Sequence, residues 1–264
     1  MEFAIGLVLY RPEPALFARL EIISRRGYHI YVFDNSPEST NRADSELAGR
    51  ASVTYMTAGK NVGLGFAISA ICATAYMKGH ERLLFLDQDT GITEQTLDYV
   101  RDRVVQHRDV VERDYAAIVF KSEGGTGSDI LEVDFTISSG SLFALRALQE
   151  IGWHNHTYFV DCVDYEFSLN ARHKGYKLGV VHETPGFDHV SEQPDQALHL
   201  LGKRLLVRRY SARRIRDALS GYVRLIAGCM AAFRILDAYL MTRSLSIYIA
   251  GQVLARVAIK SSNV

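Results

Sequence analysis

Arg82-Leu83-Leu84-Phe85-Leu86-Asp87-Gln88-Asp89-Thr90 contains four consecutive apolar residues followed by two carboxylates one residue apart. The apolar run is too short for a helix and is bounded by charge, so it predicts a buried central strand. In an open α/β sheet, ligands bind beyond the carboxyl ends of the strands, which places Asp87 and Asp89 at the expected binding edge. Two such carboxylates suit Mg²⁺ or Mn²⁺, which in turn suit a diphosphate. The alternative is a solvated turn that caps the following helix.

The length and charge of the chain limit its organisation. At 264 residues it fits one large α/β domain, or one such domain with a helical appendage. The formal net charge is zero, but residues 200–264 contain 12 Lys and Arg and only two acids, Asp217 and Asp237. An acidic body with a basic C-terminal end predicts that this end meets an anionic partner, such as phosphates or a lipid surface. We expect no nucleic-acid partner.

The cysteines and the apolar runs indicate the cellular compartment of the protein. Cys72, Cys162 and Cys229 show no pairing pattern or metal-ligand spacing, which favours buried free thiols in a reducing compartment. The chain opens on an expected strand, without a basic leader and an apolar signal segment. The uncharged run over 244–255 is well below the roughly 20 residues that span a bilayer. We therefore expect a cytoplasmic protein without a transmembrane helix.

The N-terminal part alternates expected strands and helices. Apolar runs predict strands over 3–9, 29–33 and 53–56, and apolar residues at helical spacing predict helices over 14–26 and 66–78. This order predicts a parallel sheet with right-handed crossovers, in which the strand ends share one edge.

The remainder of the chain adds further expected elements, which are helices over 93–107, 144–151 and 164–174, strands over 116–120 and 177–181, and a strand–bend–strand segment over 135–143. Thr93 is the expected N-cap of its helix. From Pro194 onward the pattern is long and helical, with interruptions expected at Gly221 and Gly251.

A second group of acids lies within residues 159–167, where Asp161, Asp164 and Glu166 interrupt an apolar and aromatic stretch. Asp164 stands where a helix should begin, so one interpretation is a structural N-cap. Glu166 falls in the first turn, where the helix dipole favours an acid. The other interpretation is the wall of a cleft, in which a carboxylate can act as general base on an acceptor hydroxyl.

Two later signals are weaker when taken alone. His189, in Asp188-His189, becomes a candidate metal ligand if it converges with Asp89 on one cation; otherwise a single histidine is usually structural or solvated. Tyr210-Ser211-Ala212-Arg213-Arg214 is basic and helical, and such a run is usually a solvated face. A positive group held over a diphosphate would stabilise a leaving anion.

In their order along the chain, these segments resemble the inverting family 2 glycosyltransferases with the GT-A fold, and within them the rhamnosyltransferase-type branch that uses dTDP-L-rhamnose. The resemblance covers about residues 3–214. The matching segments are Val32-Phe33-Asp34-Asn35-Ser36, Asn61-Val62-Gly63-Leu64-Gly65-Phe66, Leu86-Asp87-Gln88-Asp89-Thr90, Ser139-Gly140-Ser141-Leu142-Phe143, and residues 159–167 with Gly175-Tyr176. The chain departs from the branch at Val190-Ser191-Glu192, which lacks the usual glycine, and at Arg214, which replaces an asparagine.

The resemblance implies roles on the donor side of the site. Asp89 would bind a divalent cation, Mg²⁺ or Mn²⁺, directly, Asp87 would contact ribose or metal-bound water, and His189 would be a metal or diphosphate ligand. The residues implied for the nucleotide pocket are Tyr10, Asp34, Asn61 and Gly63, with Asp87, and those implied for the diphosphate are Tyr210 and Arg213.

On the acceptor side, the resemblance implies that Asp164 is the catalytic base of a single displacement that inverts the anomeric carbon. Asp161 and Glu166 would orient the acceptor and the base. Ser139 and Gly140 belong to the segment that matches the acceptor side of the family.

The implied fold is α/β of the GT-A type: a Rossmann-like, mixed but mostly parallel sheet flanked by helices, with a C-terminal helical extension. Residues 1–200 would form the catalytic domain, with a nucleotide-sugar half over about 1–90 and an acceptor half over about 91–200. Residues 201–264 would form a basic amphipathic helical region. The implied activity is metal-dependent transfer of L-rhamnose from dTDP-L-rhamnose to a hydroxyl of a glycan or lipid-linked glycan, in the synthesis of cell-surface polysaccharide such as O-antigen.

Several alternatives stay open from the sequence. The donor could be a UDP- or GDP-hexose, or the chain could be a catalytically silent nucleotide-sugar-binding module at the membrane. A nucleotidyltransferase fits less well, because Tyr10-Arg11-Pro12 replaces the glycine-rich loop expected after the first strand. Residues 201–264 would either pack on the catalytic domain or on a partner subunit in a homodimer, or lie on the inner face of the cytoplasmic membrane.

Overall fold

The computed structural model describes residues 2–37, 47, 49–123, 129–189, 196–200 and 203–261. The chain divides into two compact units, each described below by itself. The first comprises Met1–Phe159 with Val163–Val190, and the second comprises Val160–Cys162 with Ser191–Val264. The functional halves predicted within residues 1–200 stay a prediction.

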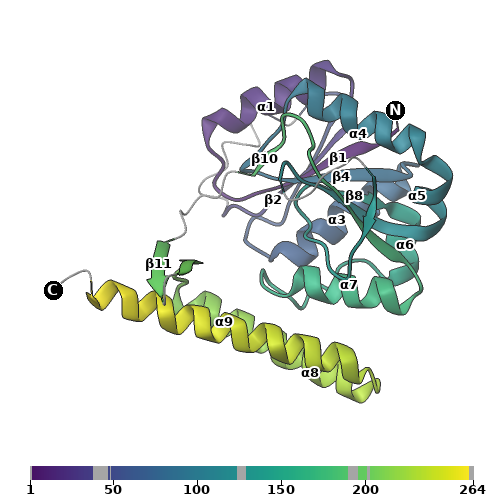
Figure 1. The fold of residues 1–264 in the computed structure, drawn as a ribbon. Coiled ribbons are helices and arrows are strands. Elements are labelled where there is room, and N and C mark those ends of the chain that lie inside the picture. The colour runs from purple at the N-terminus through teal and green to yellow at the C-terminus, as the bar shows by residue number, and fades with distance from the viewer. Residues whose placement is uncertain are drawn as a thin grey trace. The chain divides into compact units, whose positions relative to one another are not determined.

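The first unit is built on an eight-stranded sheet with the order β3-β2-β1-β4-β8-β6-β9-β7 (Figure 1). Its strands are β1 (Ala4–Leu9), β2 (Ile30–Asp34), β3 (Val53–Thr57), β4 (Arg82–Asp87), β6 (Tyr115–Phe120), β7 (Leu131–Glu132), β8 (Ser141–Ala144) and β9 (Lys177–Val181). The first four strands are parallel, β8 runs antiparallel between β4 and β6, and β9 is parallel to β6. The predicted mixed, mostly parallel sheet is confirmed.

Helices cover both faces of this sheet. They are α1 (Pro14–Arg25), α3 (Leu64–Met77), α4 (Glu94–Gln106), α5 (Arg108–Asp114), α6 (Leu145–Ile151) and α7 (Val163–His173). Figure 1 shows α1 and α4 on one face and α3, α6 and α7 on the other. Alternate residues of β4 point to opposite faces of the sheet. Leu84 and Leu86 join the core under α1 and α4, whereas Phe85 contacts Phe143 on the opposite face. Coverage on both faces explains why the central strands are apolar without alternation.

The segment before β8 corrects one prediction. The structure has no strand over 135–138, although the sequence predicts one there. The N–H of Thr136 donates to Oγ of Ser168 at 3.2 Å, and the N–H of Ser138 donates to Oδ1 of Asp164 at 3.0 Å. Side chains of α7 therefore take the hydrogen bonds that a neighbouring strand would take. The predicted N-cap of α4 is confirmed, because Thr93 and Thr96 form a reciprocal capping box.

The second unit contains a hairpin of β11 (Gln196–Leu200) and β12 (Lys203–Val207), followed by α8 (Ala212–Ala231) and α9 (Ile235–Ser261). The prediction of a long helical pattern from Pro194 onward is therefore wrong for the two strands, and it is confirmed for α8 and α9. The two strands pair antiparallel, with Gln196 opposite Val207 and Leu200 opposite Lys203. No helix in the described ranges is long and apolar enough to cross a bilayer.

The predicted interruptions at Gly221 and Gly251 are also wrong, because both glycines lie inside their helices. Gly221 instead permits close packing, since an added Cβ would lie 2.9 Å from Sγ of Cys162. The break falls at Phe233, whose φ of 57° is left-handed. The N–H of Arg234 donates to the carbonyl oxygen of Cys229 at 2.8 Å, which is the hydrogen bond of a Schellman motif.

Candidate active site

The carboxyl ends of β1 to β4 meet at one edge of the sheet, as predicted. The register pairs Val8 with Asp87 and Leu9 with Asp34. Tyr10 follows β1 directly and is 42% exposed. The fold therefore brings three of the residues predicted for the nucleotide, Tyr10, Asp34 and Asp87, to neighbouring strand ends.

The Asp-Gln-Asp loop, residues 87–89, is held from two sides. The N–H of Tyr10 donates to Oε1 of Gln88 at 2.8 Å, and Nε2 of Gln88 donates to the carbonyl oxygen of Tyr10 at 3.2 Å. Arg19 of α1 donates from Nη1 to the carbonyl oxygen of Thr90 at 2.8 Å and from Nη2 to that of Gln88. These contacts fix the backbone of the loop, and the side chains of Asp87 and Asp89 remain partly exposed.

A short antiparallel ladder brings His189 to this loop. Strand β5 (Thr90–Gly91) starts directly after Asp89 and pairs with β10 (Asp188–His189), which sets the backbone of His189 opposite Thr90. The His189 side chain lies outside the described part of the structure. Among the described residues, no group of three or more His, Cys, Asp or Glu is placed to hold a metal ion. The metal set of Asp87, Asp89 and His189 thus stays a prediction, and its carboxylate oxygens are the donors that Mg²⁺ and Mn²⁺ prefer.

Asp34 is completely buried at the end of β2. Its Oδ2 accepts a hydrogen bond from the Tyr55 hydroxyl at 2.9 Å, and its Oδ1 accepts one from the N–H of Ser36 at 2.8 Å. The carboxylate thus shapes the turn that follows the strand. Its contact with a nucleotide stays a prediction.

The Asn61-Val62-Gly63 turn, which opens α3, is held by Asn35, a residue to which sequence reasoning gave no role. Oδ1 of Asn35 accepts from the N–H of Val62 at 3.1 Å, and Nδ2 donates to the carbonyl oxygen of Gly63 at 3.2 Å. Within the turn, Oδ1 of Asn61 accepts from the N–H of Gly63 at 3.0 Å. Gly63 has φ of 91°, and an added Cβ would lie 2.9 Å from the carbonyl oxygen of Phe159. Only glycine fits this position without strain.

One turn, Ser138-Ser139-Gly140, contacts both predicted halves of the site. Ser138 donates its N–H, at 3.0 Å, and its hydroxyl to Oδ1 of Asp164. Oγ of Ser139 lies 2.9 Å from Oγ1 of Thr90, the residue that follows the Asp-Gln-Asp loop. Gly140, predicted on the acceptor side with Ser139, has φ of 75°, and an added Cβ would meet the Phe187 ring at 2.6 Å. The predicted base and the predicted metal loop are therefore linked through a single buried turn.

Asp164 lies in the first turn of α7, after the helix has begun at Val163, so the interpretation as an N-cap is wrong. Its carboxylate faces the Ser138 turn rather than the free N–H groups of its own helix. Burial raises the pKa of Asp164, and the hydrogen bonds from Ser138 act in the opposite direction. A carboxylate whose pKa is raised in this way is a stronger base once it is ionised.

The other two acids of this stretch have different surroundings. The Glu166 side chain is buried in α7, where Oε1 accepts from Nδ2 of Asn170 at 2.6 Å and from Nδ2 of Asn155 at 3.5 Å. Asp161 belongs to the second unit, where Nε of Arg214 lies 3.3 Å from its Oδ2. Burial raises the pKa of Asp161, and Arg214 opposes that change. Orientation of the acceptor or of the base by these acids stays a prediction.

The two residues predicted for the diphosphate also belong to the second unit. The N–H of Tyr210 donates to Oε1 of Gln252 at 3.1 Å, and its carbonyl oxygen accepts from Nη2 of Arg256 at 2.9 Å. The Arg214 guanidinium lies 4.4 Å from the centroid of the Tyr210 ring. Arg213 is exposed on the first turn of α8. Their diphosphate contacts stay a prediction.

A cavity of about 290 Å³ opens beside the Ser138-Ser139-Gly140 turn. Ser139 and Asp188, the neighbour of His189, both line it, and its other lining residues are Phe120, Lys121, Ser122, Glu123, Ile137 and Phe187. Its volume is at the lower end of ligand sites, which start at roughly 300 Å³. The cavity has room for part of a ligand that approaches the linked acids.

Comparisons with known proteins bear on the fold and on the family that the chain resembles. No family model matches the chain. A curated relative, the dTDP-rhamnosyl transferase RfbF of Shigella flexneri, is 24% identical over 234 residues, which are 80% of this chain and 77% of the relative. The structure of S. aureus TarS 1–349 in complex with UDP-GlcNAc matches with a TM-score of 0.57 and 14% identity over 95% of this chain and 72% of that one. In a longer TarS structure, the match covers only 36% of the solved chain.

A further solved structure, GalNAc-T7 with UDP, GalNAc and Mn²⁺, matches with a TM-score of 0.54 and 14% identity over 69% of this chain and 42% of that one. Together the comparisons confirm the GT-A fold class and the resemblance to family 2 glycosyltransferases, and the name of the curated relative agrees with the prediction of a glycosyltransferase.

Proposed function

We propose that this chain moves L-rhamnose from dTDP-L-rhamnose to a hydroxyl of a glycan or lipid-linked glycan acceptor. The transfer inverts the anomeric carbon, as in the GT-A glycosyltransferases of family 2 that the chain resembles. The observation that carries the proposal is the Ser138-Ser139-Gly140 turn, which contacts both the Asp164 carboxylate and the residue next to the Asp-Gln-Asp loop. The choice of donor is supported by the relative named as a dTDP-rhamnosyl transferase.

On the donor side, Asp89 and Asp87, with His189 from the adjacent strand, would hold Mg²⁺ or Mn²⁺. When bound, the cation neutralises diphosphate charge and so makes the nucleoside diphosphate a better leaving group. Arg19 keeps the loop in place by donating to the carbonyl oxygens of Gln88 and Thr90, and the Gln88 side chain ties the loop to the backbone of Tyr10. The Mn²⁺ in the GalNAc-T7 structure supports a divalent cation in this fold.

On the acceptor side, Asp164 is the base. Both described hydrogen bonds from Ser138 go to Oδ1, which leaves Oδ2 to accept the proton of the acceptor hydroxyl. The hydroxyl oxygen then forms a bond to the anomeric carbon, and the electron pair of the broken bond leaves with the nucleoside diphosphate. The glycosyl bond of the product thus has the opposite configuration to that of the donor.

A donor panel tests this proposal. The purified full chain is incubated with dTDP-L-rhamnose, UDP-GlcNAc, UDP-glucose or GDP-mannose, with and without Mn²⁺, and binding is measured by the rise in unfolding temperature. We expect the largest rise with dTDP-L-rhamnose and Mn²⁺, a loss of the Mn²⁺-dependent part in Asp89→Asn, and no change in Asp102→Asn, an exposed acid of α4. A larger rise with a UDP- or GDP-sugar would reject the donor, and binding without any release of nucleoside diphosphate would favour a silent binding module.

A further inference from the structure

Helix α9 is apolar on two opposite sides. One side packs on α8 and buries Ala238, Met241 and Ala255. The large apolar side chains of the other side are 44–66% exposed, and they are Ile235, Leu236, Tyr239, Ile247, Ile249 and Val253. Their spacing places them along one exposed face of the helix. A helix that is apolar all round normally has a partner on each side, whether protein or lipid.

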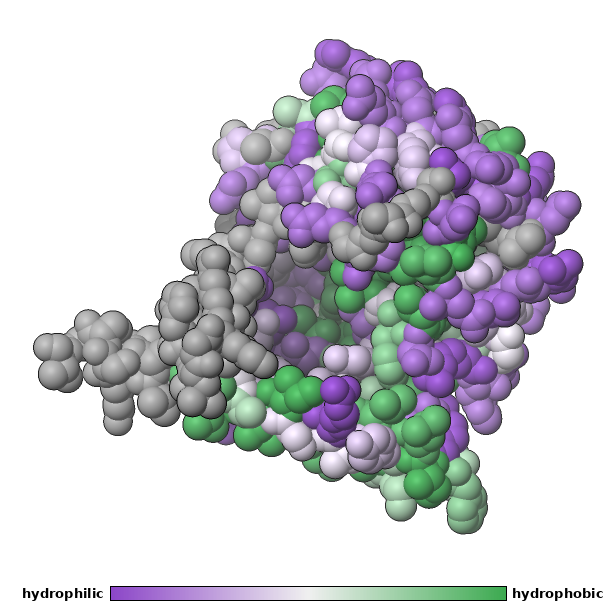
Figure 2. Space-filling model, viewed as in Figure 1, coloured by the Kyte–Doolittle hydropathy of each residue, from purple (hydrophilic) through white to green (hydrophobic). Residues whose placement is uncertain are grey.

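The turn between α8 and α9 extends this exposed surface. Met230 is 52% exposed and Phe233 is 88% exposed. The Schellman motif at the turn holds the backbone of Phe233 in a left-handed conformation, without a glycine. Figure 2 shows hydrophobic side chains gathered at this end of the hairpin, at the lower right of the view. We call Met230, Phe233 and the six exposed residues of α9 the apolar surface of the hairpin.

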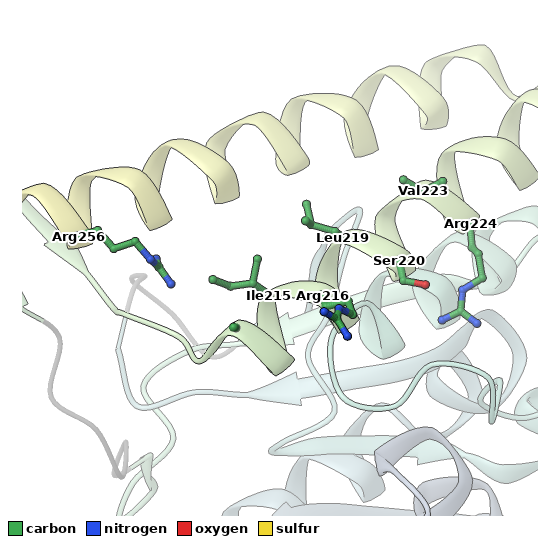
Figure 3. A pocket seen from close by; sticks show the side chains of 8 residues that line it. Ile215, Arg216, Leu219, Ser220, Val223, Arg224 and Arg256 are labelled. Atoms are coloured by element: carbon green, nitrogen blue, oxygen red, sulfur yellow. The ribbon is translucent and has the colours of Figure 1, made fainter.

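Arginines accompany the apolar residues. A groove of about 710 Å³ along the α8–α9 hairpin has Ile215, Leu219 and Val223 on one wall (Figure 3). Arg216 and Arg224 of α8 and Arg256 of α9 line the same groove. On α9, the exposed Arg243 stands between Tyr239 and Ile247 of the apolar surface. The hairpin therefore presents apolar and cationic groups together.

We propose that the α8–α9 hairpin binds an anionic lipid bilayer and lies in the plane of its interface. The apolar surface of the hairpin enters the boundary between headgroups and acyl chains, and Arg216, Arg224 and Arg243 contact lipid phosphates while their aliphatic stems stay against the apolar layer. This surface does not depend on the proposed transferase activity. It does fit an acceptor that is anchored in lipid.

The charge distribution favours lipid over a second copy of the chain. A two-fold contact through the hairpin would bring the same surface of each copy together, and with it the exposed arginines. The acids of residues 200–264 are only Asp217 and Asp237, too few to neutralise the 12 basic residues of the segment. Oδ2 of Asp217 already accepts the N–H groups of Val160 and Asp161, each at 3.2 Å. Anionic phosphates supply the missing negative charge.

Co-sedimentation of the full chain with vesicles tests this proposal. We expect binding to vesicles of phosphatidylglycerol and phosphatidylcholine in equal parts, weaker binding at high salt, and little binding to phosphatidylcholine alone. Phe233→Ser with Leu236→Ser should lower the partition coefficient at least about tenfold. Arg216→Gln with Arg243→Gln should lower it by about ten- to thirtyfold at low salt.

Matched controls come from the first unit. Met77→Ser with Val105→Ser removes two apolar side chains that are also exposed, by 77% and 56%, and Arg25→Gln with Arg146→Gln removes two exposed charges. Both controls should bind like the unaltered chain, and all variants should keep its unfolding temperature. Failure of the full chain to bind would overturn the proposal. So would equal binding by the hairpin variants, or a dimer that Phe233→Ser with Leu236→Ser converts to monomer without an effect on vesicle binding.

Discussion

Replacing Ser138 by alanine removes one hydrogen bond to the predicted base and leaves the rest of the turn in place. The hydroxyl of Ser138 donates to Oδ1 of Asp164, and the N–H of the same residue donates to the same oxygen at 3.0 Å. A hydrogen bond to a charged group contributes about 1.5–3 kcal/mol, so the ionised form of Asp164 loses stabilisation of this order. These hydrogen bonds lower the pKa of Asp164 against the effect of burial, and the pKa must therefore rise when one is removed.

The assay is the pH dependence of kcat/KM for release of nucleoside diphosphate. A base acts only when it is ionised, so the acidic limb of the profile should move to higher pH in Ser138→Ala, while the rate above that limb stays within a few-fold of the original. Ser138→Thr keeps the hydroxyl and should restore the profile. Ser24→Ala, a control on α1, should leave the profile unchanged. A limb that does not move, or that moves to lower pH, would refute this role for Ser138.

Three further predictions concern Arg19, Gly63 and His154. Arg19→Gln should raise the Mn²⁺ concentration needed for half-maximal donor binding several-fold, because the Asp-Gln-Asp loop loses two hydrogen bonds to its backbone, whereas Arg25→Gln should not. Gly63→Ala should lower stability in thermal unfolding by more than Gly79→Ala. Both glycines have positive φ, a conformation that costs other residues about 1–2 kcal/mol, but only at Gly63 would the added Cβ also meet the Phe159 carbonyl oxygen. Equal losses of stability in the two variants would contradict this contact. His154 has its pKa lowered to about 3 by burial, so the folded state binds fewer protons than the unfolded state below pH 6.5 and loses stability as pH falls, by about 2 kcal/mol at pH 5. Denaturant unfolding at pH 7 and pH 5 should therefore show a smaller loss of stability at pH 5 in His154→Phe than in the unaltered chain. An equal loss in the two proteins would contradict the role of His154.

The N-terminal part of the fold could be predicted because each of its strands is marked by a local sequence pattern. The apolar runs before Asp34 and Asp87 are continuous, and each ends in a polar turn. The rule that parallel strand ends share one edge then placed these acids together, and the observed register agrees.

The predictions that were wrong or missing concern residues whose structure depends on contacts between segments distant in the sequence. Residues 135–138 alternate like a strand, but side chains of α7 take their hydrogen bonds. Gly221 has low helix propensity, yet its contact with Cys162 determines that a glycine stands there. Arg19 gave no local signal, because its partners are backbone carbonyls of a loop some 70 residues away. The candidate acids were thus predictable as residue types, whereas the groups that hold them were not.

The most direct test of the proposed chemistry separates donor binding from turnover in Asp164→Asn. Donor binding is measured by thermal shift with dTDP-L-rhamnose and Mn²⁺, and turnover by release of nucleoside diphosphate. Loss of a general base reduces turnover by about 10²–10⁴-fold, so we predict normal donor binding with a loss of that size. Near-normal turnover in Asp164→Asn would contradict the assignment of the base, and a parallel loss of donor binding would contradict its placement on the acceptor side.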